Sequence, residues 1–193
     1  MCSHYQLKVR LRDLARRFRF TLPEPVEEVD DIRPTARAPV IAGGGRLALQ
    51  TWGLPAAWDG RPLINARAED LRNRKTFRPL LESRCLVPAT CYFEWRRDGR
   101  NRLKNVIAAA DGATFAFAGL TDGERFAIIT RAAAPAIAHI HERMPVILSE
   151  KDETDWISRA LHFEDVASLL LPQAGRPLAF VEEVPRNFQP SLF

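Results

Sequence analysis

A cysteine stands directly after the start methionine, where it can perform chemistry that no internal cysteine can. Removal of a start methionine usually proceeds when the second residue is small, so we expect the mature chain to begin at Cys2. A free α-amine with an unperturbed pKa of about 8 then lies beside a thiol with a pKa of about 8.5. An amine condenses with an aldehyde to an imine, and the thiol closes a thiazolidine ring on the imine carbon. The alternative is an accidental cysteine in a frayed terminus, and we expect no core to cover a thiol at this position.

Imine formation needs a proton shuttle, and carboxylic acids and imidazoles are the usual choices. Glu94 ends the stretch "RCLVPATCYFEW" at 84–95, which alternates as one strand would. Counted with a period of two, Glu94 lies opposite the apolar face, together with Thr90 and Tyr92. This count favours a solvated edge carboxylate over a carboxylate that faces a cleft.

His141 belongs to "HIHERMPVIL" and has two interpretations. Two histidines at this spacing are compatible with a metal site, but no cysteine or acidic partner stands at a recognisable ligand spacing. We therefore expect neither a metal nor any other cofactor. Pro145 disfavours helical dihedral angles in the residue before it, so His141 and Arg143 are predicted on an extended or turning segment.

The composition indicates one globular domain over residues 1–193. The chain has 193 residues and 46% hydrophobic content, enough for one sizeable core. No stretch approaches the roughly 20 apolar residues of a membrane span, and no signal segment begins the chain. Three cysteines are an odd number without metal-ligand spacing, so reduced thiols are expected. We expect a monomer in the cytoplasm, associated with the nucleoid if the source is bacterial.

Basic residues are clustered along a chain whose formal net charge is +4. The clusters fall at 8–19, 67–78 and 96–104, while acidic residues gather at 24–31. Such a distribution suits a polyanionic partner. Solvated helix faces and a charged hairpin tip explain any single cluster equally well.

The hydrophobic pattern predicts a mixed fold with a largely antiparallel sheet. Residues 6–19 read as an amphipathic helix that ends before Pro23, and residues 69–83 read as a second helix. Two strands are expected around the glycine triplet at 43–45, and three more are joined by Asp-Gly turns at 111 and 122. The segment "AAAPAIAHIHERMPVIL", which starts at residue 132, suggests a short helix before a strand at 146–148, and two late helices follow.

Seven short stretches together resemble the SRAP family, the SOS-response-associated peptidases that are also called abasic-site processing proteins. They are "MC", "RPTARAPVI", "WGLPAAW", "INARAED", "RCLVPATCYFEW", "AGL" and "HERMPVIL", in this order over most of the chain. The resemblance implies an α+β fold, a single domain with a barrel-like antiparallel sheet core and peripheral helices. It also implies a positively charged groove for single-stranded DNA.

The resemblance assigns a reaction and four reactive residues. Family members crosslink their leading cysteine to the ring-opened aldehyde of an abasic site, which shields the lesion from strand cleavage. On this basis Cys2 is the nucleophile and Asn65 orients it or the open sugar, although Asn65 has a rival role as a turn-capping residue. Glu94 becomes the general acid and base, against the count of strand faces. His141 stabilises the sugar oxygen and assists a lyase-like side reaction.

The implied partner is single-stranded DNA that contains abasic sites. Arg67 and Arg143 are expected to grip phosphates beside the lesion, and Trp52 to line the groove or stack on a base. Trp52 and Trp58 have a rival role in the core, which we prefer for Trp58. His4 stands where the family usually carries arginine and is placed with the DNA-binding residues. A thiol peptidase and a non-covalent binder of damaged DNA remain as alternative functions.

Overall fold

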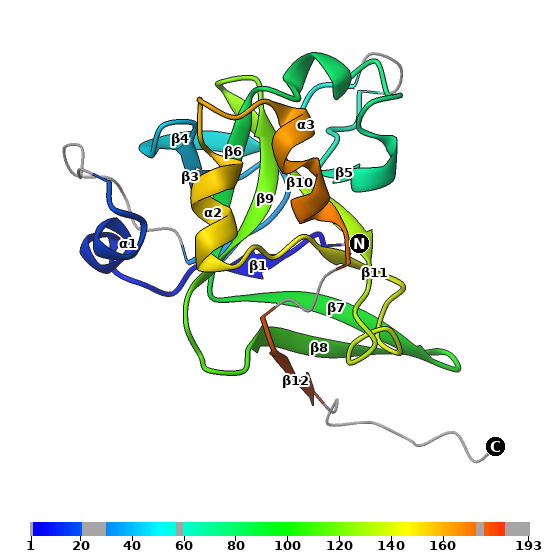
Figure 1. Ribbon diagram of the computed structural model, residues 1–193. Coiled ribbons are helices and arrows are strands. Elements are labelled where there is room, and N and C mark those ends of the chain that lie inside the picture. Colours follow the sequence, from blue (N-terminus) through cyan, green and yellow to red (C-terminus); the bar gives the residue numbers. More distant parts are fainter. Residues whose placement is uncertain (1, 21–29, 57–59, 173–175, 184–193) are drawn as a thin grey trace.

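The computed structural model describes residues 2–20, 30–56, 60–172 and 176–183, and Figure 1 shows their arrangement. The expected end of the first helix at Pro23 and the expected core position of Trp58 lie outside the described residues. Within the described ranges, the strands form two sheets, one of five strands and one of seven. Three α-helices and three short 3-10 helices pack around them. The predicted α+β class is therefore confirmed.

The seven-stranded sheet closes into a barrel-like ring. Its strands are β3 (Arg37–Ala42), β4 (Arg46–Trp52), β5 (Asn65–Arg67), β6 (Arg84–Ala89), β9 (Phe115–Thr121), β10 (Arg125–Ala132) and β11 (Arg143–Pro145). The order runs β10-β4-β3-β6-β9, and β9 pairs with β10 again, which closes the ring. Both the hairpin at the glycine triplet and the Asp-Gly turn before β10 occur as predicted.

The five-stranded sheet carries the start of the chain. Its strands are β1 (Tyr5–Gln6), β2 (Asp31–Ile32), β7 (Cys91–Asp98), β8 (Asn101–Ala109) and β12 (Leu178–Glu183), in the order β12-β8-β7-β1-β2. The β7–β8 hairpin and β12 lie along the lower side of the view in Figure 1. Because β1 pairs with β2 on one side and β7 on the other, the first residues of the chain lie inside a sheet.

Strand β10 brings distant segments to the same place. It pairs in parallel with β5, with Asn65 opposite Ile128, and antiparallel with β11. The register of each pairing fixes which residues of β5 and β11 lie beside β10. Parallel pairs also join β10 to β4, so the ring is mostly but not wholly antiparallel.

The helices differ from the sequence prediction at three places. Only Leu11–Phe18 form the first helix, α1, because the residues before it pair as β1. Residues 69–83 hold turns and the 3-10 helices η1 (Ala68–Asp70) and η2 (Arg78–Leu80), because Pro79 limits helix continuation there. The end of β10 and turns replace the short helix expected from residue 132, and the following strand comes earlier, as β11.

The late helices occur as expected and cover one side of the ring. They are α2 (Glu150–Trp156) and α3 (Phe163–Val166), followed by η3 (Ala167–Leu170). Trp156 is fully buried, and its indole N–H donates to the carbonyl of Cys85 at 3.0 Å. Among the described residues, no helix has the length and apolar character that a membrane crossing requires.

Candidate active site

Cys2 lies in the protein interior, contrary to the expectation that no core would cover it. Its side chain is completely buried, and its Sγ is 3.8 Å from the carbonyl oxygen of His4. Cys2 is buried because it comes just before β1, and β1 lies between β2 and β7 in the five-stranded sheet. Burial raises the pKa of the Cys2 thiol, and the negative charge of Glu94 raises it further. The sulfur is therefore held as a neutral thiol at rest.

Asn65 contacts the backbone of the nucleophile directly. It begins β5, whose parallel pairing with β10 sets its position. The side-chain amide nitrogen donates to the carbonyl oxygen of Cys2 at 2.7 Å. Its amide oxygen is buried and has no hydrogen-bond partner among the described residues. A residue that holds the carbonyl of Cys2 also restrains the α-amine of the same residue.

Glu94 is buried, so the solvated edge carboxylate suggested by the count of strand faces is wrong. Only 4% of the residue is exposed. The count failed because the chain bends at Thr90 and β6 and β7 belong to different sheets. Burial raises the pKa of Glu94, and the positive charge of His141 acts in the opposite direction. A carboxyl with a raised pKa can exchange protons closer to neutral pH.

His141 lies on a turning segment before β11, as predicted. The backbone N–H of Arg143 donates to its Nδ1 at 2.9 Å. Nδ1 also lies 3.2 Å from the carbonyl oxygen of Arg143, so this backbone offers a partner to either tautomer of the ring. The imidazole is close enough to Glu94 for its charge to affect the pKa of that carboxyl. The ring is half-buried and can reach both the interior and the surface.

The four predicted reactive residues therefore gather from four separate parts of the chain. Asn65 is bonded to Cys2, Glu94 acts electrostatically on Cys2, and His141 acts on Glu94. Their positions depend on β1, β5, β7 and the segment before β11. A thiol, a carboxyl and an imidazole that influence one another's charge can support covalent chemistry with proton transfer. Among the described residues, no group of three or more potential ligands could hold a metal ion.

Trp52 does not line a groove, so the expectation that it stacks on a base is wrong. The residue is fully buried, and its indole N–H donates to the carbonyl of Ile64 at 2.8 Å. Its ring stacks on Phe126, with 6.3 Å between ring centroids, and meets Tyr5 edge-on. The rival core interpretation holds, because Trp52 ends a strand of the closed ring and its side chain points into the core.

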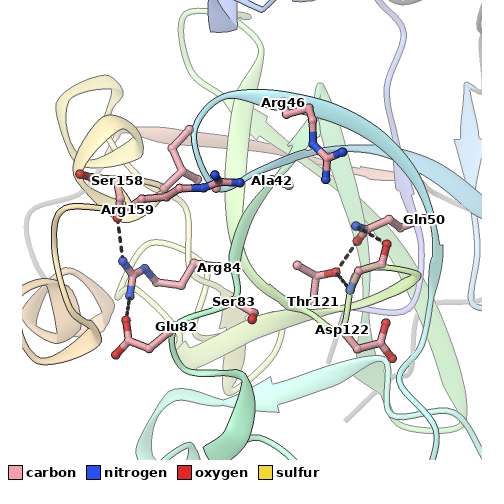
Figure 2. A pocket seen from close by; sticks show the side chains of 13 residues that line it. Ala42, Arg46, Gln50, Glu82, Ser83, Arg84, Thr121, Asp122, Ser158 and Arg159 are labelled. Carbon is pink, nitrogen blue, oxygen red and sulfur yellow. Dashed lines mark hydrogen bonds and ion pairs between the residues drawn. The ribbon is translucent and has the colours of Figure 1, made fainter.

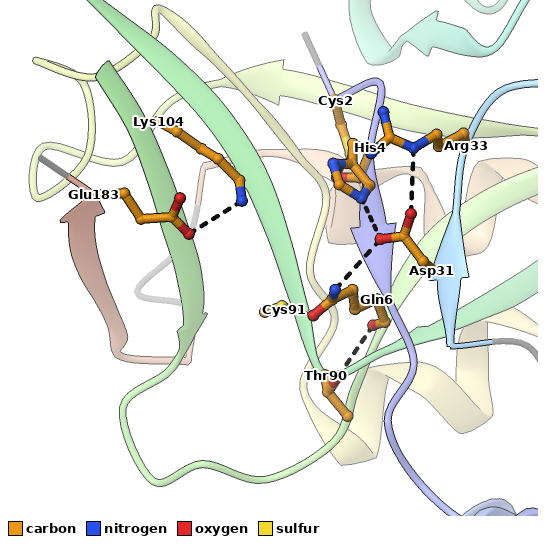
Figure 3. Close-up of polar contacts among 9 residues, drawn as sticks. All are labelled: Cys2, His4, Gln6, Asp31, Arg33, Thr90, Cys91, Lys104 and Glu183. Carbon is orange, nitrogen blue, oxygen red and sulfur yellow. Dashed lines mark hydrogen bonds and ion pairs between the residues drawn. The ribbon is translucent and has the colours of Figure 1, made fainter. Parts of the chain in front are cut away.

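His4 faces the protein and not a DNA groove, so its placement with the DNA-binding residues is also wrong. The residue is 5% exposed, and its Nε2 lies 2.5 Å from an oxygen of Asp31 (Figure 3). Its ring packs against Phe93 at 4.1 Å between centroids. The hydrogen bond from His4 and those from Gln6 and Arg33 hold the pKa of Asp31 at about 2. His4 is thus occupied in joining β1 to β2.

The two arginines expected to grip phosphates differ in availability. Arg67 is exposed at the end of β5. Arg143 forms a two-pronged ion pair with Glu69, at 2.5 and 2.9 Å, and donates to the carbonyl of Thr130 at 2.8 Å. Only 11% of its side chain is exposed, whereas that of Glu69 is 54% exposed. A phosphate would have to displace the Glu69 carboxylate to reach Arg143.

Sequence reasoning missed the acidic partners of these cations. Asp31 and Glu69 belong to runs of charged residues that read as solvated surface. His4 carried one usable signal, since it stands where the family usually carries arginine. The structure places it in contact with Asp31. No local feature of the sequence pairs Glu69 with Arg143, which is 74 positions away.

A separate cavity of about 260 Å³ lies by the β3–β4 turn and the end of α2 (Figure 2). Polar side chains that line it form hydrogen bonds within the protein. Arg84 is buried and donates to the carboxylate of Glu82 and to the carbonyls of Leu81, Trp156, Ser158 and Leu161. Thr121 donates to Gln50 at 2.6 Å. We therefore assign this cavity a structural role and place the candidate active site around Cys2.

Comparison with known proteins gives the family. Residues 1–186 match the model of the SOS response associated peptidase (SRAP) family. The chain belongs to this family. The "Abasic site processing protein YoqW" of Bacillus subtilis is 32% identical over 180 residues, which are 82% of this chain and 80% of the relative. The "Abasic site processing protein YobE" of the same organism is 33% identical, over 89% of each chain.

Solved structures have the same fold. A crystal structure of a protein from Bacteroides thetaiotaomicron has a TM-score of 0.81 and 26% identity, and the match covers 94% of this chain and 91% of that one. A protein from Bordetella bronchiseptica has a TM-score of 0.80 and 25% identity, with 95% and 100% covered. The closed ring with its attached five-stranded sheet is therefore shared with these proteins.

Proposed function

We propose that this protein processes abasic sites in DNA by forming a covalent adduct between Cys2 and the lesion. The proposal rests on the cluster around Cys2, above all on the 2.7 Å hydrogen bond from Asn65 to the Cys2 carbonyl. Membership of the family and the printed names of the relatives support DNA abasic sites as the substrate. The reaction requires that Met1 be removed, because only then does Cys2 carry a free amine.

The proposed adduct is a thiazolidine. The α-amine of Cys2 adds to the aldehyde of the ring-opened deoxyribose, and loss of water gives an imine. The sulfur then forms a bond to the imine carbon, and the thiol proton ends on the nitrogen. No oxidant or cofactor enters this sequence. A five-membered ring that contains both atoms is more stable to hydrolysis than an imine alone.

The surrounding side chains divide the remaining tasks. Asn65 holds the Cys2 carbonyl and so directs the amine toward the aldehyde. Glu94 transfers the protons that carbinolamine formation and water loss require, aided by its raised pKa. His141 donates a hydrogen bond to the sugar oxygen from Nε2. The same groups can promote reversal or a lyase-like strand cleavage.

A single strand suits this site better than a duplex. Extruding an abasic residue from a duplex costs a few kcal/mol, whereas an exposed strand presents it directly. Arg67 is exposed beside Asn65, and Arg143 lies behind Glu69. Each phosphate contact contributes only modest, salt-sensitive affinity. The covalent bond is therefore what keeps the protein attached to the lesion.

An oligonucleotide with one abasic site tests the proposal. Intact mass spectrometry first establishes that the protein begins at Cys2. We expect a shifted band on a denaturing gel for the wild type and none for Cys2→Ala. Cys2→Ser keeps the amine but loses the sulfur, so its adduct should require borohydride to survive denaturation. A stable adduct with Cys2→Ala, or none with the wild type, would contradict the proposal.

The same protein and oligonucleotide can distinguish this proposal from the thiol peptidase that the family description suggests. Acylating the α-amine of Cys2 blocks imine formation but leaves the thiol able to attack a peptide carbonyl. Adduct formation that survives acylation would favour ordinary thiol chemistry. Reversible, salt-labile binding to intact and abasic strands alike, without an adduct, would favour a non-covalent binder.

A further inference from the structure

The β7–β8 hairpin carries a basic cluster that takes no part in the proposed reaction. Residues 96–104 of this hairpin include four arginines and one lysine. Two of these cations are neutralised by the neighbouring strand β12. Arg96 forms a two-pronged ion pair with Glu182, with both distances at 2.8 Å, and the Nζ of Lys104 lies 3.0 Å from Glu183. Three cations of the cluster remain.

The remaining cations, Arg97, Arg100 and Arg102, are exposed and form no hydrogen bond or ion pair with any residue that the structure describes. Arg97 and Arg102 lie directly opposite each other in the β7–β8 register. The Cβ atoms of such a pair are about 5 Å apart, and like charges at these positions destabilise a sheet. The hairpin therefore holds two positive charges together at a cost to its own stability, and an anion between them would remove this repulsion.

The same hairpin connects these arginines to the candidate active site. Arg97 lies three residues after Glu94 on β7, a separation of about 10 Å along an extended strand. The positive charge of Arg102 acts to lower the pKa of Glu94, against the larger effect of burial. Figure 1 shows the hairpin as one continuous arm along the lower side of the view. A DNA strand whose abasic site lies beside Glu94 can therefore continue along β7 to the exposed arginines.

We propose that Arg97 and Arg102 form a phosphate clamp for the single-stranded DNA that flanks the abasic site, with Arg100 in the turn beyond them. A guanidinium can donate two parallel hydrogen bonds to one phosphate, and a phosphate held by both arginines replaces their repulsion with attraction. Contacts to the DNA backbone carry no sequence information, so the clamp should accept any flanking sequence. This inference rests on the proposed function and adds a binding surface outside the reactive cluster.

Binding of a stable abasic analogue tests the clamp without a covalent step. The probe is a fluorescent single strand with a central tetrahydrofuran residue, which has no aldehyde, and about ten nucleotides on each side. We expect Arg97→Gln/Arg102→Gln to bind it about tenfold more weakly at low salt and to flatten the log–log salt dependence by about 1.4, the value for two phosphates.

The matched control is Arg12→Gln/Arg46→Gln, which removes the same charge from exposed arginines of α1 and β4. These two elements lie on the opposite side of the view from the hairpin tip (Figure 1). The control should bind the probe nearly as well as the wild type does. An unchanged affinity in the hairpin variant, or an equal loss in the control, overturns the inference.

The position of the analogue within the probe locates the contact. Moving the tetrahydrofuran residue to the 5′ end or to the 3′ end removes one flank at a time. One of these two probes should bind the wild type and the hairpin variant equally well, because its missing flank is the one that the clamp holds. An equal loss of affinity for all three probes would assign the effect to general charge attraction and overturn the clamp.

The repulsion between the two arginines should also appear in the protein without DNA. Arg102→Gln relieves it, so the thermal midpoint should rise at low salt, and the gain should shrink as salt increases. A midpoint that falls or stays the same would contradict the strained pair. Adduct formation by the wild type is a separate measurement, so failure of the clamp is distinct from failure of the proposed function.

Discussion

A buried carboxyl with a raised pKa, such as Glu94, affects stability and chemistry in opposite directions. Its folded-state pKa lies above the unfolded value, so the folded protein binds this proton more tightly. The stabilisation is present at low pH and is lost as the pH rises from the unfolded pKa through the folded one. Near pH 7, the ionised group therefore lowers the free energy of unfolding while it serves as a proton shuttle.

Glu94→Gln should separate these two effects. The amide keeps the shape of the side chain but transfers no proton, so single-turnover adduct formation near pH 7 should slow by about 10²-fold or more. The free energy of unfolding at pH 7, measured with urea, should rise because no charge is buried. An unchanged single-turnover rate would remove Glu94 from the mechanism.

The sequence predicted which residues carry the chemistry better than it predicted what surrounds each of them in the folded protein. The resemblance led to Cys2, Asn65, Glu94 and His141, and these four gather in the structure. It was wrong for Trp52, because an aromatic ring suits a core and a DNA groove equally well.

At the scale of elements, the short strand β1 depends on its neighbours to stay in place. It has two residues, and β2, its partner on one side, has two as well. The His4–Asp31 pair and the bond from Gln6 to Asp31 reinforce this edge (Figure 3). The pKa of Asp31 is lowered to about 2 in the folded protein, so its stabilisation is fully present above the pKa that Asp31 has in the unfolded chain. The stabilisation is lost as the pH falls through the folded-state pKa.

Asp31→Asn should loosen β1 more than it destabilises the whole protein. We expect a loss of about 1 kcal/mol at pH 7, since the Asp31 side chain is 44% exposed and partly screened by solvent. Hydrogen exchange of the β1 and β2 amides should accelerate. Asp30→Asn makes the same change of charge on an exposed neighbour and should have little effect. Equal exchange in both variants would contradict the assigned tether.

Element boundaries were predictable where turn residues mark them. The hairpins at the glycine triplet and at Asp122-Gly123 occur as expected, because glycine adopts the positive φ that these turns need. The turn at Asp111-Gly112 also forms, but it joins strands of different sheets and makes no hairpin. The prediction failed at 69–83, where Pro79 limits helix continuation, and at Glu94, where the pairing of distant strands decides the conformation. The bend at Thr90 moves the chain from one sheet to the other, and counting within one strand cannot reveal that change.

For the whole molecule, a modest net charge of +4 raises the question of how DNA is attracted. One phosphate-binding candidate, Arg143, is already held by Glu69. The carboxylate occupies the guanidinium in the two-pronged way that a phosphate would. The positive side chain of Arg143 keeps the pKa of Glu69 below its usual value, so the pair persists at neutral pH.

Glu69→Gln should therefore strengthen non-covalent binding. In a Cys2→Ala background, we expect several-fold tighter binding of single-stranded DNA at low salt, with the gain shrinking as salt increases. Arg143→Ala should flatten the log–log salt dependence by about 0.7, the value for one phosphate on a single strand. The matched control is Asp111→Asn. Asp111 lies in the β8–β9 turn, and the change breaks its ion pair with Arg176. An equal gain in that control would assign the effect to net charge alone.

The buried guanidinium of Arg84 has a consequence for synthesis on the ribosome. Three of its acceptors, the carbonyls of Trp156, Ser158 and Leu161, come from a segment made more than 70 residues later. Until that segment emerges, a nascent chain that buried Arg84 would hold a cation short of acceptors, which is strongly unfavourable. The barrel-like ring should thus close only after residues 156–161 have left the ribosome, and chains cut before this segment should expose the strands of the ring.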